Sequence, residues 1–588
     1  MAEKIIDCIS GKEIVATPEE KYATQPFCKI LMEDYGYEKS MIVTRPQVRV
    51  KTTPSDKKGY PMDIVVYENI AGNKEIKMIV ECKKPDTKFK ESERKQLEIY
   101  MSFSGAKIGV LYNGKQSLYL YRSKKNDLDI FKEMPSIPKA YENINEIGLY
   151  KKENLRPTHN LKNVFEEIRG WIVANGNITR DDEIASQMIL LMLCKIYDER
   201  FSESDKNCEF RATLQDSDED IENRIKKLFI AIQVKYEDVI TSKDQILFNA
   251  KTLRGIIGRL QSFSIIQTER DVMADAFEVF IDKSVKESEG QFFTPRNVIN
   301  IIIEAIDIQK NDKIIDSACG SGGFLVQSLR KLESIIEEEG EKYGWSTAAK
   351  IEEVKTLAIK NIRGIEKDPF LTKLSKSYMA ILGDGKGGIF NEDALELPKN
   401  WSLQTQANVK LGDFDILLAN PPFGKNIKVE GRDKLSQYQL SYYHQKGNPK
   451  LKKQGNVSTL FLERNMQFLK IGGKLGIILP EPYFALPSYK ECIEFMFKNN
   501  NILWIIDLPH NTFRPHNNAK CCAIVIQKGM PQQEYINMAV AEYIGHDHQG
   551  KPIYDDNKQI KDDTFQIIKE IIASRKNSDS KIFQGGGG

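Results

Sequence analysis

Strands and helices alternate from about residue 290 to residue 530, and this pattern constrains the fold more strongly than any other feature. Short apolar runs, typical of buried strands, are separated by longer segments with helical spacing of apolar residues. These runs and segments occupy residues 313–316, 323–333, 362–366, 370–382, 415–419, 457–469 and 474–479. Such alternation is typical of a doubly wound sheet with helices on both faces. We therefore predict a Rossmann-like α/β domain over residues 286–530.

Changes in the apolar pattern divide the rest of the 588 residues into further parts. Residues 1–125 combine a helical stretch with short apolar runs, which predicts an α+β domain. Residues 126–155 are polar and rich in loop-forming residues, so we expect a linker there. Helical spacing dominates residues 156–285 and predicts a helical bundle. Residues 531–588 are expected to form a C-terminal extension with a flexible glycine tail, so the fold class is multidomain α/β.

The overall composition excludes several classes of protein. The 85 Lys and Arg residues nearly balance the 83 Asp and Glu residues, and a net charge of +2 argues against a histone-like binder of nucleic acid. No apolar run approaches the ~20 residues of a membrane-spanning helix, and the N-terminus lacks a signal pattern, so we expect no membrane association. The nine cysteines include no CxxC pair, which is typical of reduced thiols in a cytoplasmic protein. Charge alone would suit an enzyme of small substrates.

A glycine-rich turn follows the first strand of the α/β part, in the segment KIIDSACGSGG at residues 313–323. Gly320 and Gly322 let the backbone approach a ligand, and the start of the next helix supplies free N–H groups. The strand at 362–366 ends in Glu366, a carboxylate of the kind that binds ribose hydroxyls. Taken singly, each feature could also be an ordinary turn or a solvated acid.

The segment FDILLANPPF at residues 414–423 ends a predicted strand in Asn420, Pro421, Pro422 and Phe423. An exocyclic amine conjugated to a ring is a poor nucleophile and needs acceptors for its two hydrogens. The Asn420 side-chain oxygen and the Pro421 carbonyl can accept them and aim the lone pair, while Phe423 stacks on the ring. The two prolines hold the backbone in place. The alternative interpretation is a turn that merely ends a strand.

Together and in this order, these motifs resemble the amino-methyltransferases of restriction–modification systems, most closely the type I modification subunits and related adenine-N6 enzymes. The resemblance covers residues 275–528 and implies S-adenosylmethionine as the cofactor. It implies that the segment GQFFTP at 290–295 contacts the methionine part of the cofactor, and that Asp393 lies near its adenine amine. Ser317 stands where the family commonly has proline. The cofactor-binding residues implied are Phe293, Thr294, Pro295, Asp316, Ala318, Gly320, Gly322, Glu366 and Asp393.

The substrate is less narrowly specified than the cofactor. Similar catalytic motifs act on cytosine N4 and on glutamine side chains of protein release factors. The position of GQFFTP ahead of the glycine-rich turn, with a helical bundle before it, favours adenine in double-stranded DNA.

Three residues of the N-terminal part form a D…ExK pattern. Glu81 and Lys83 are two apart on a predicted strand and share a face, and Asp63 lies on the partner strand of the hairpin. Two carboxylates can hold Mg²⁺, and the lysine can steady the attacking water or the phosphate charge. Gln96 and Tyr100 are four apart on a helix and can face the same site. This pattern alone also occurs by chance.

Residues 7–122 resemble the N-terminal nuclease domain of type I restriction subunits, a PD-(D/E)xK fold. The resemblance implies a Mg²⁺-dependent endonuclease. Its implied catalytic residues are Asp63, Glu81, Lys83 and Gln96, with Asp63 and Glu81 as metal ligands. Glu33 or Asp34 would supply a further acid. The alternative is a degenerate domain that only docks DNA.

Charge is distributed unevenly along the chain. Residues 424–456 carry eight Lys or Arg against two acids, with tyrosines between them, which predicts phosphate contact and base stacking. The DNA contacts predicted there are Lys425, Lys428, Arg432, Lys434, Tyr438 and Tyr442. A solvated loop is the alternative. Residues 509–520 are a second candidate, and residues 201–220 are acidic.

Two expected parts of a complete type I enzyme are not found in this chain. There is no GxxxxGK[ST] phosphate loop for an ATP-driven motor, and little sequence follows residue 530. We therefore expect a separate specificity subunit in a hetero-oligomer.

The sequence thus predicts the catalytic subunit of a restriction–modification or phage-defence system. It would methylate adenine N6 in DNA with S-adenosylmethionine and cut unmodified DNA with Mg²⁺. The alternatives are a methyltransferase whose nuclease-like domain only binds DNA, and a non-catalytic defence scaffold.

Overall fold

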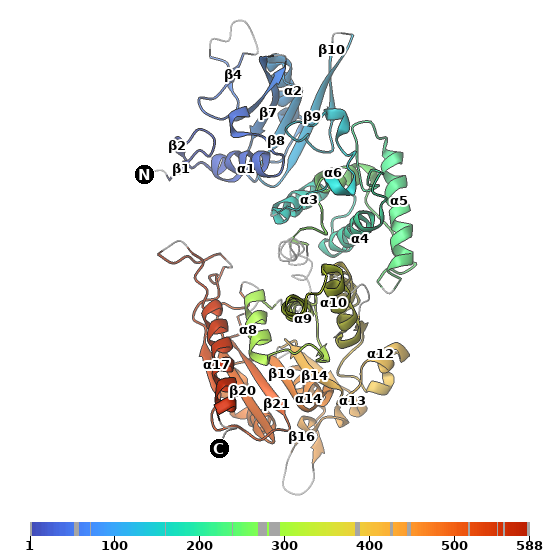
Figure 1. Cartoon of the computed structure of the whole chain (residues 1–588), viewed down its shortest axis with the longest axis vertical. Helices are drawn as coiled ribbons and strands as arrows, with labels where there is room; N and C mark the ends of the chain where they lie inside the picture. The colour runs from blue at the N-terminus through green and yellow to red at the C-terminus, as the bar shows by residue number, and fades with distance from the viewer. Residues whose placement is uncertain are drawn as a thin grey trace. The chain divides into compact units, whose positions relative to one another are not determined.

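A computed structural model gives the architecture of the chain (Figure 1). It describes residues 3–51, 58–70, 72–126, 128–158, 160–237, 239–268, 279–280, 294–382, 388–423, 427–443, 449–514, 518–549, 551–556 and 559–584. The chain forms two compact units, the first of residues 1–235 and 242–284 and the second of residues 236–241 and 285–588. None of the helices in the described ranges is both long and apolar enough to span a bilayer.

The first unit is built on a six-stranded sheet in the order β10-β9-β8-β7-β6-β3. Its strands are β3 (Ile42–Val43), β6 (Ile64–Ile70), β7 (Asn73–Cys82), β8 (Ile108–Tyr112), β9 (Ser117–Lys125) and β10 (Leu128–Glu133). Strands β6 and β7 form the expected hairpin, and β7 pairs parallel with β8 through the crossover helix α2 (Glu91–Ser104). Helix α1 (Gln25–Glu33) packs on one face and α2 on the other. Two short pairs complete this part, β1 (Lys4–Ile6) with β2 (Glu13–Val15) and β4 (Arg49–Val50) with β5 (Tyr60–Pro61).

The predicted linker is largely structured. Its first residues form β10, which pairs antiparallel with β9. The apolar side chains of Met134, Ile137, Ala140 and Ile147 then enter the core beneath the sheet. Ser136 is buried as well, and the chain folds back onto β9, where the Met134 N–H donates to the Tyr119 carbonyl. Because its apolar residues are scattered, the segment shows no strand pattern, and its sequence predicted neither β10 nor its packing under the sheet.

Helices follow in the first unit, as the spacing predicts. They are α3 (Leu161–Asn175), α4 (Asp181–Phe201), α5 (Asp218–Lys235) and α6 (Ala250–Leu260). A buried polar cluster joins them to the sheet. Arg259 of α6 donates to the backbone oxygen of Ser117 at 2.9 Å, and its Nε lies 3.5 Å from the carboxylate of Glu167. The ion pair joins α6 to α3, and the hydrogen bond to Ser117 joins α6 to β9, so the helices pack against the sheet.

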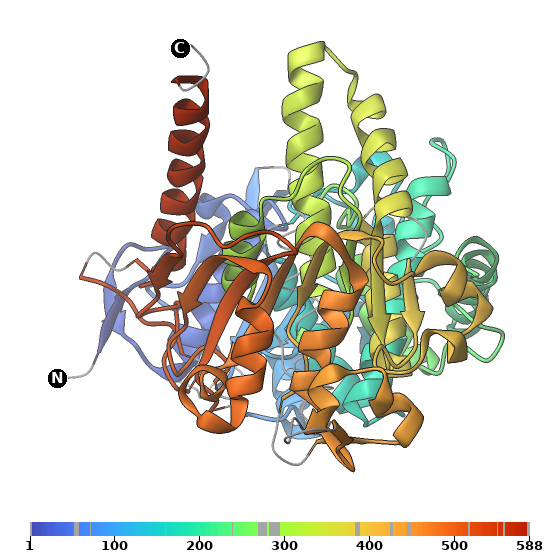
Figure 2. The ribbon, with the colours of Figure 1, turned by 90° about the horizontal axis from the view of Figure 1, so that it is seen from below.

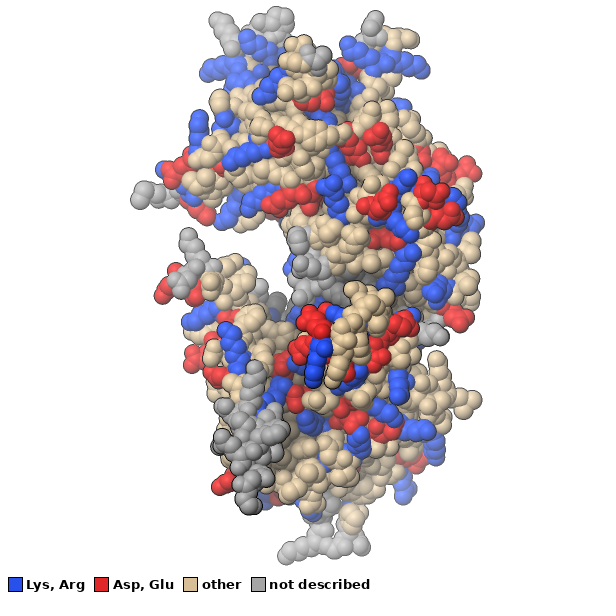
Figure 3. Space-filling model, viewed as in Figure 1, with Lys and Arg blue, Asp and Glu red and all other residues tan. Residues whose placement is uncertain are grey.

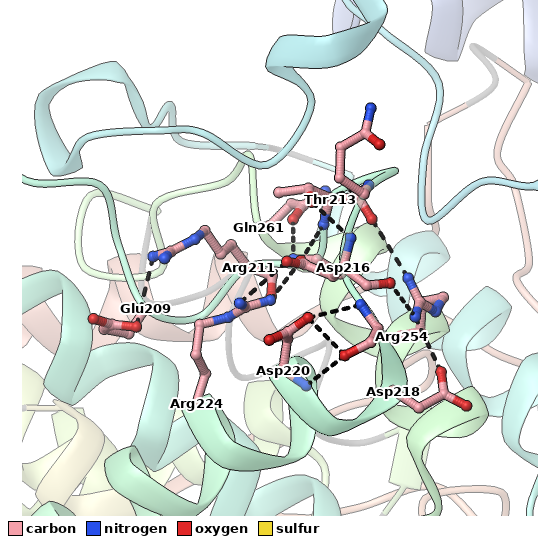
Figure 4. Close-up of polar contacts among 12 residues, drawn as sticks. Glu209, Arg211, Thr213, Asp216, Asp218, Asp220, Arg224, Arg254 and Gln261 are labelled. Carbon is pink, nitrogen blue, oxygen red and sulfur yellow. Dashed lines mark hydrogen bonds and ion pairs between the residues drawn. The ribbon is translucent and has the colours of Figure 1, made fainter.

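Two acids of the acidic segment around the start of α5 pair with arginines within this unit (Figure 4). Arg224 of α5 pairs with Asp216, and Arg254 of α6 pairs with Asp218 at 3.0 Å. Two of the acids in residues 201–220 are therefore paired with arginines of α5 and α6, whereas Glu203, Asp205 and Glu219 are exposed.

The second unit contains an eight-stranded sheet in the order β13-β12-β11-β14-β19-β21-β20-β22. Its strands are β11 (Ile314–Asp316), β12 (Ile362–Glu366), β13 (Ile389–Asn391), β14 (Phe414–Ala419), β19 (Leu469–Pro480), β20 (Asn500–Asp507), β21 (Cys521–Lys528) and β22 (Asn537–Val540). The pairs are parallel except those that β21 makes. This confirms the predicted doubly wound sheet, and β22 shows that the predicted C-terminal extension contributes a strand to it.

Helices cover both faces of this sheet. The helices of the second unit are α8 (Arg296–Ile306), α9 (Gly323–Tyr343), α10 (Thr347–Asn361), α11 (Pro369–Leu382), α12 (Leu403–Asn408), α13 (Arg432–Ser436), α14 (Val457–Phe468), α15 (Pro482–Ala485), α16 (Lys490–Phe497) and α17 (Thr564–Gln584). Helices α8 and α17 share one core with the sheet, and α14 and α16 share the opposite core. Helices α9 and α10 run side by side and extend away from the sheet (Figure 2).

The strand order creates a switch point at the centre of this sheet. Strand β11 pairs with β12 on one side and with β14 on the other, all three parallel. Their carboxyl ends meet at the same edge, where ligands bind in open α/β sheets. Asp316, Glu366 and Asn420 end or follow these three strands.

Candidate active site

A cavity of about 510 Å³ opens at this edge of the sheet. That volume lies within the range typical of small-molecule sites. The predicted residues that line it come from the cofactor set, the catalytic set and the set of DNA contacts: Ala318, Gly320, Glu366, Asp393, Asn420, Pro421, Pro422, Phe423, Lys428 and Lys434. The structure therefore brings predicted site residues from several separate segments of the sequence to one cavity.

The glycine-rich turn is tied to Glu366. The backbone N–H of Gly320 donates to one carboxylate oxygen of Glu366 at 2.8 Å, and the N–H of Asp368 donates to the other at 2.9 Å. Gly320 and Gly322 have φ values of 53° and 89°, which residues with a Cβ rarely adopt. Burial raises the pKa of Glu366. The turn and the acid are thus positioned as one element.

Asp316 lies beneath this turn and is 1% exposed. Its carboxylate accepts the N–H of Ala318 at 3.0 Å. Burial, reinforced by the negative charge of Glu366, raises the pKa of Asp316 to about 8. The carboxyl group is therefore mostly protonated at neutral pH.

The raised pKa of Asp316 predicts a pH dependence of stability. Unfolding returns the carboxyl to its ordinary pKa of 3.8, so between that pH and about 8 the folded protein holds a proton that the unfolded chain releases. This stabilisation is complete below the ordinary pKa and is lost as pH rises through about 8. The variant Asp316→Asn cannot ionise, so its melting temperature relative to wild type should rise between about pH 5 and about pH 8.

Thermal melts across this range check the prediction. Asp433→Asn, at an exposed carboxylate of α13, is the control and should follow the wild-type slope. Parallel slopes for Asp316→Asn and wild type would contradict it.

Asp393 is held by two lysines. Its Oδ2 lies 2.6 Å from Lys434 Nζ and 3.2 Å from Lys367 Nζ. Burial opposes ionisation, but the hydrogen bond and charge of Lys434, with the charge of Lys367, lower the pKa of Asp393. Lys434 also lies 3.4 Å from Glu396. Lys434, predicted to contact DNA, therefore belongs to the wall of the cavity, because acids distant in sequence draw it inward.

The predicted catalytic segment contains a buried acceptor that has no partner among the described residues. Asn420 Nδ2 donates to Thr294 Oγ1 at 3.0 Å, whereas Asn420 Oδ1 is buried and has no hydrogen-bond partner among the described residues. Ser458 Oγ donates to the Pro422 carbonyl at 3.1 Å. Phe423 is largely buried and packs edge-on against Phe513, with ring centroids 6.2 Å apart. A buried, unpaired acceptor is costly unless a ligand supplies the donor.

The predicted DNA contacts divide into two sets. Tyr438 is 0% exposed, donates to the Leu395 carbonyl at 2.7 Å and accepts from Arg464, so it is not exposed for base stacking. Its burial follows from packing of the segment onto α14, which the surrounding lysines concealed. Lys428 and Arg432 are exposed and Tyr442 is half-buried. These three stay predicted contacts.

Three further observations bear on the predicted site residues. Phe293 and Lys425 lie outside the described residues. Pro295 caps the start of α8, next to Thr294. Sequence reasoning missed Arg464, a fully buried cation whose only signal is its place among apolar residues of α14.

The first unit brings its predicted acids together. The register of β6 and β7 places Ile64 opposite Val80, so Asp63 and Glu81 are neighbours on adjacent strands. Asp63 accepts the N–H of Cys82 at 2.8 Å, and Lys83 Nζ lies 2.8 Å from Glu81 Oε1. Burial and the charge of Glu81 raise the pKa of Asp63 to about 7. Glu81 Oε2 is buried with no hydrogen-bond partner in the described part of the chain.

The surroundings of this acid pair differ from the prediction. Glu19 and Glu20, which sequence reasoning missed, also raise the pKa of Asp63 by their charge. They lie at the start of the π-helical turn Glu20–Thr24 before α1. The predicted Asp34 instead accepts hydrogen bonds from Thr158 and Asn160 at 3.3 Å. Asp63 lies just before β6 and Glu81 lies on β7. The sequence does not show which end of the helical segment near α1 lies close to these two acids, and the structure shows that it is the end with Glu19 and Glu20.

Gln96 and Tyr100 of α2 contact each other, with Gln96 Nε2 donating to the Tyr100 hydroxyl at 2.6 Å. The charges of Glu81 and Lys83 act on Tyr100, which is consistent with the predicted common site. Within the described ranges, no group of three or more His, Cys, Asp or Glu side chains is arranged to hold a metal ion. The acid pair is therefore an incomplete metal site by itself.

Surface charge on one face of the molecule is mixed. Figure 3 shows Lys and Arg side chains interspersed with Asp and Glu across the face that it displays. Acidic and basic side chains therefore do not separate into two regions on this face.

Two family models match the chain. The model of N-6 DNA Methylase matches residues 268–583, more than half of the chain, and the model of the type I restriction enzyme R protein N terminus matches residues 18–138. These matches cover the second unit and the sheet of the first.

Curated relatives resemble part of the chain. It is 25% identical over 291 residues to the type I restriction enzyme EcoEI methylase subunit of Escherichia coli, covering 49% of this chain and 52% of the relative. It is 22% identical over 289 residues to the type II restriction enzyme and methyltransferase RM.BcgI of Heyndrickxia coagulans, covering 47% and 38%. The chain thus spans about half or less of the length of these relatives.

Two solved structures align with the chain at low identity. A structure of a type I R-M system aligns with a TM-score of 0.47 and 20% identity, covering 70% of this chain and 82% of that one. The type IIG restriction endonuclease BpuSI aligns with a TM-score of 0.38 and 15% identity, covering 86% and 56%.

Proposed function

Because the chain belongs to the N-6 DNA methylase family, we propose that its second unit transfers a methyl group from S-adenosylmethionine to adenine N6 in double-stranded DNA. The enzyme would supply the modification activity of a restriction–modification system. The observation that carries this proposal is the buried, unpartnered Asn420 Oδ1 in the same cavity as Glu366 and Asp393. One cavity therefore contains acceptors for both a nucleoside-bearing cofactor and a substrate amine.

The residues fit the proposed cofactor. Glu366 is a carboxylate at the end of the second strand, suited to the ribose hydroxyls, and the turn at Gly320 and Gly322 leaves room for close approach. Asp393 can accept from the adenine amine if it exchanges its contact with Lys434. S-adenosylmethionine supplies a methyl group on a positively charged sulfur.

The catalytic segment would act on an adenine flipped out of the helix. Asn420 Oδ1 and the Pro421 carbonyl accept hydrogen bonds from the two N–H groups of N6, and this directs the nitrogen lone pair at the methyl carbon. S-adenosylmethionine, when bound, would supply the methyl carbon as the electrophile, with its neutral sulfide as the leaving group. The amine then releases its extra proton to solvent, so no strong base is needed. Phe423 packs beside the ring.

Family membership favours adenine over the two alternatives, cytosine N4 and a glutamine amide. A separate specificity subunit in a hetero-oligomer is part of the proposal. It is supported by the inward-facing Lys434 and Tyr438, which leave fewer DNA contacts on this segment than its composition suggests.

Mapping modified bases tests the proposed function. The chain would be expressed in a host lacking DNA methylation, with and without its candidate specificity subunit, and the host DNA sequenced by a long-read method that detects modified bases. We expect N6-methyladenine at one recognition sequence when both proteins are present. Absence of modified adenine, or modification of cytosine alone, would overturn the proposal.

A second candidate activity belongs to the first unit. Glu81 Oε2 is buried and unpaired beside Lys83 and Asp63, which favours a bound cation there. We propose that Asp63 and Glu81 hold Mg²⁺ for cleavage of DNA, with Lys83 and Gln96 beside them; the ion would supply positive charge for the phosphate. The alternatives are a first unit that only binds DNA and a non-catalytic defence scaffold.

A further inference from the structure

Thr294 and Asn420 are joined by a hydrogen bond although they lie 126 positions apart in the sequence. Thr294 precedes α8, whose side chains Val298 and Ile302 are buried against the sheet. Asn420 follows β14 and is held by the prolines after it. Both partners are thus positioned by rigid parts of the fold, and the 3.0 Å contact connects them.

The two ends of an asparagine amide have opposite hydrogen-bonding character. The oxygen accepts and the nitrogen donates, although the two ends have nearly the same size and shape. An adenine N6 offers donors only on its two N–H bonds, so it can pair with the oxygen of Asn420 but not with the nitrogen. Rotation of this amide by half a turn would place donors against donors.

The observed contact selects the productive orientation. Thr294 Oγ1 accepts a hydrogen bond from Asn420 Nδ2. The other end of the amide, Oδ1, is then the buried atom with no hydrogen-bond partner among the described residues. We propose that Thr294 is a positioning residue for methyl transfer, which holds the Asn420 amide so that its oxygen faces the substrate amine. This inference rests on the proposed function and assigns to Thr294 a role separate from contact with the cofactor.

Paired substitutions separate the two roles. Thr294→Val keeps the shape of the side chain but removes the hydroxyl, and Thr294→Ser keeps the hydroxyl. We expect Thr294→Val to lower kcat by about tenfold or more, as misplacement of a reacting group does, with the KM for S-adenosylmethionine changed by less than about threefold. Thr294→Ser should restore most of the rate. Thr347→Val removes an exposed hydroxyl of α10 and is the matched control.

A base analogue reports the amide orientation without turnover. Hypoxanthine carries an oxygen at position 6, so it pairs with an amide nitrogen and is repelled by an amide oxygen. Binding would be measured with S-adenosylhomocysteine and duplexes that carry adenine or hypoxanthine at the mapped target. The preference for adenine over hypoxanthine should fall in Thr294→Val and persist in Thr294→Ser and Thr347→Val. The weaker pairing of hypoxanthine in the duplex acts equally on every variant, so it cancels between them.

Several results would overturn the inference. One is a Thr294→Val enzyme with wild-type kcat and wild-type base preference. Another is a variant that loses cofactor affinity while keeping kcat, because the hydroxyl would then serve the cofactor. A Thr294→Ser enzyme as slow as Thr294→Val would also count against it. If the wild-type protein with its partner methylates no DNA, the proposed function fails and this inference fails with it.

Discussion

Replacement of Asn420 by alanine is expected to abolish DNA methylation while cofactor binding stays close to wild type. The variant removes the buried acceptor Oδ1, which has no partner among the described residues, from a residue that lines the same cavity as Glu366. Without it, the substrate amine loses the group that aims its lone pair. We expect the single-turnover rate to fall by at least about a hundredfold, the loss seen when one preorganised polar group at a reacting centre is removed. Transfer of a labelled methyl group measures the rate, and calorimetry measures cofactor affinity.

A matched variant controls for general effects on the unit. Asn408→Ala removes the same amide from an exposed position in α12 and should leave the rate unchanged. Retained methylation in Asn420→Ala would remove Asn420 from the catalytic site. Loss of cofactor binding in the same variant would show that the substitution acts on the cofactor pocket instead.

Replacement of Glu81 by glutamine is expected to abolish Mg²⁺-dependent nicking of plasmid DNA and to spare methylation. The substitution keeps the shape but removes the charge from the buried pair with Asp63, and it also breaks the ion pair with Lys83. Loss of a direct ligand should cost more than the 10- to 100-fold typical of outer-shell partners of a metal, so we expect a reduction beyond about a hundredfold. Gel analysis of supercoiled plasmid measures the nicking rate.

The control for this variant lies on the same strand. Glu75→Gln alters an exposed carboxylate near the start of β7 and should nick as wild type does. Equal nicking by Glu81→Gln and wild type would exclude Asp63 and Glu81 as the site. Absence of nicking by the wild-type protein, with methylation intact, would instead support a first unit that only binds DNA.

Features that are contiguous in the sequence were predicted well. Strands such as β11, β12 and β14 could be predicted from the sequence because buried parallel strands are continuous apolar runs. The segment of Asn420 to Phe423 could be proposed from the sequence because its four residues are consecutive, and the structure places them in the lining of the cavity. Asp316 and Glu366 could be proposed because the carboxyl ends of parallel strands are where ligands bind in open α/β sheets.

Features that depend on long-range contacts were predicted poorly. Lys434 and Tyr438 lie in a segment rich in lysine, and their composition indicates an exposed DNA-binding strip. Their inward placement depends on Asp393 and Arg464, which are distant in the sequence. Strand β10 was missed for the same reason, because its stability comes from pairing with β9 and not from its own apolar content.

The sequence by itself determined the alternation of strands and helices, the two acidic strand ends and the catalytic segment, because local spacing and local chemistry suffice for each. Only the tertiary structure decided which charges are paired, which tyrosine is buried and which hydroxyl holds Asn420. These outcomes depend on groups that meet only after folding, where burial makes an unpaired charge or donor costly and so selects its partner. Asn420 illustrates both contributions: the sequence motif identifies the residue, and the contact with Thr294 in the folded chain orients its amide.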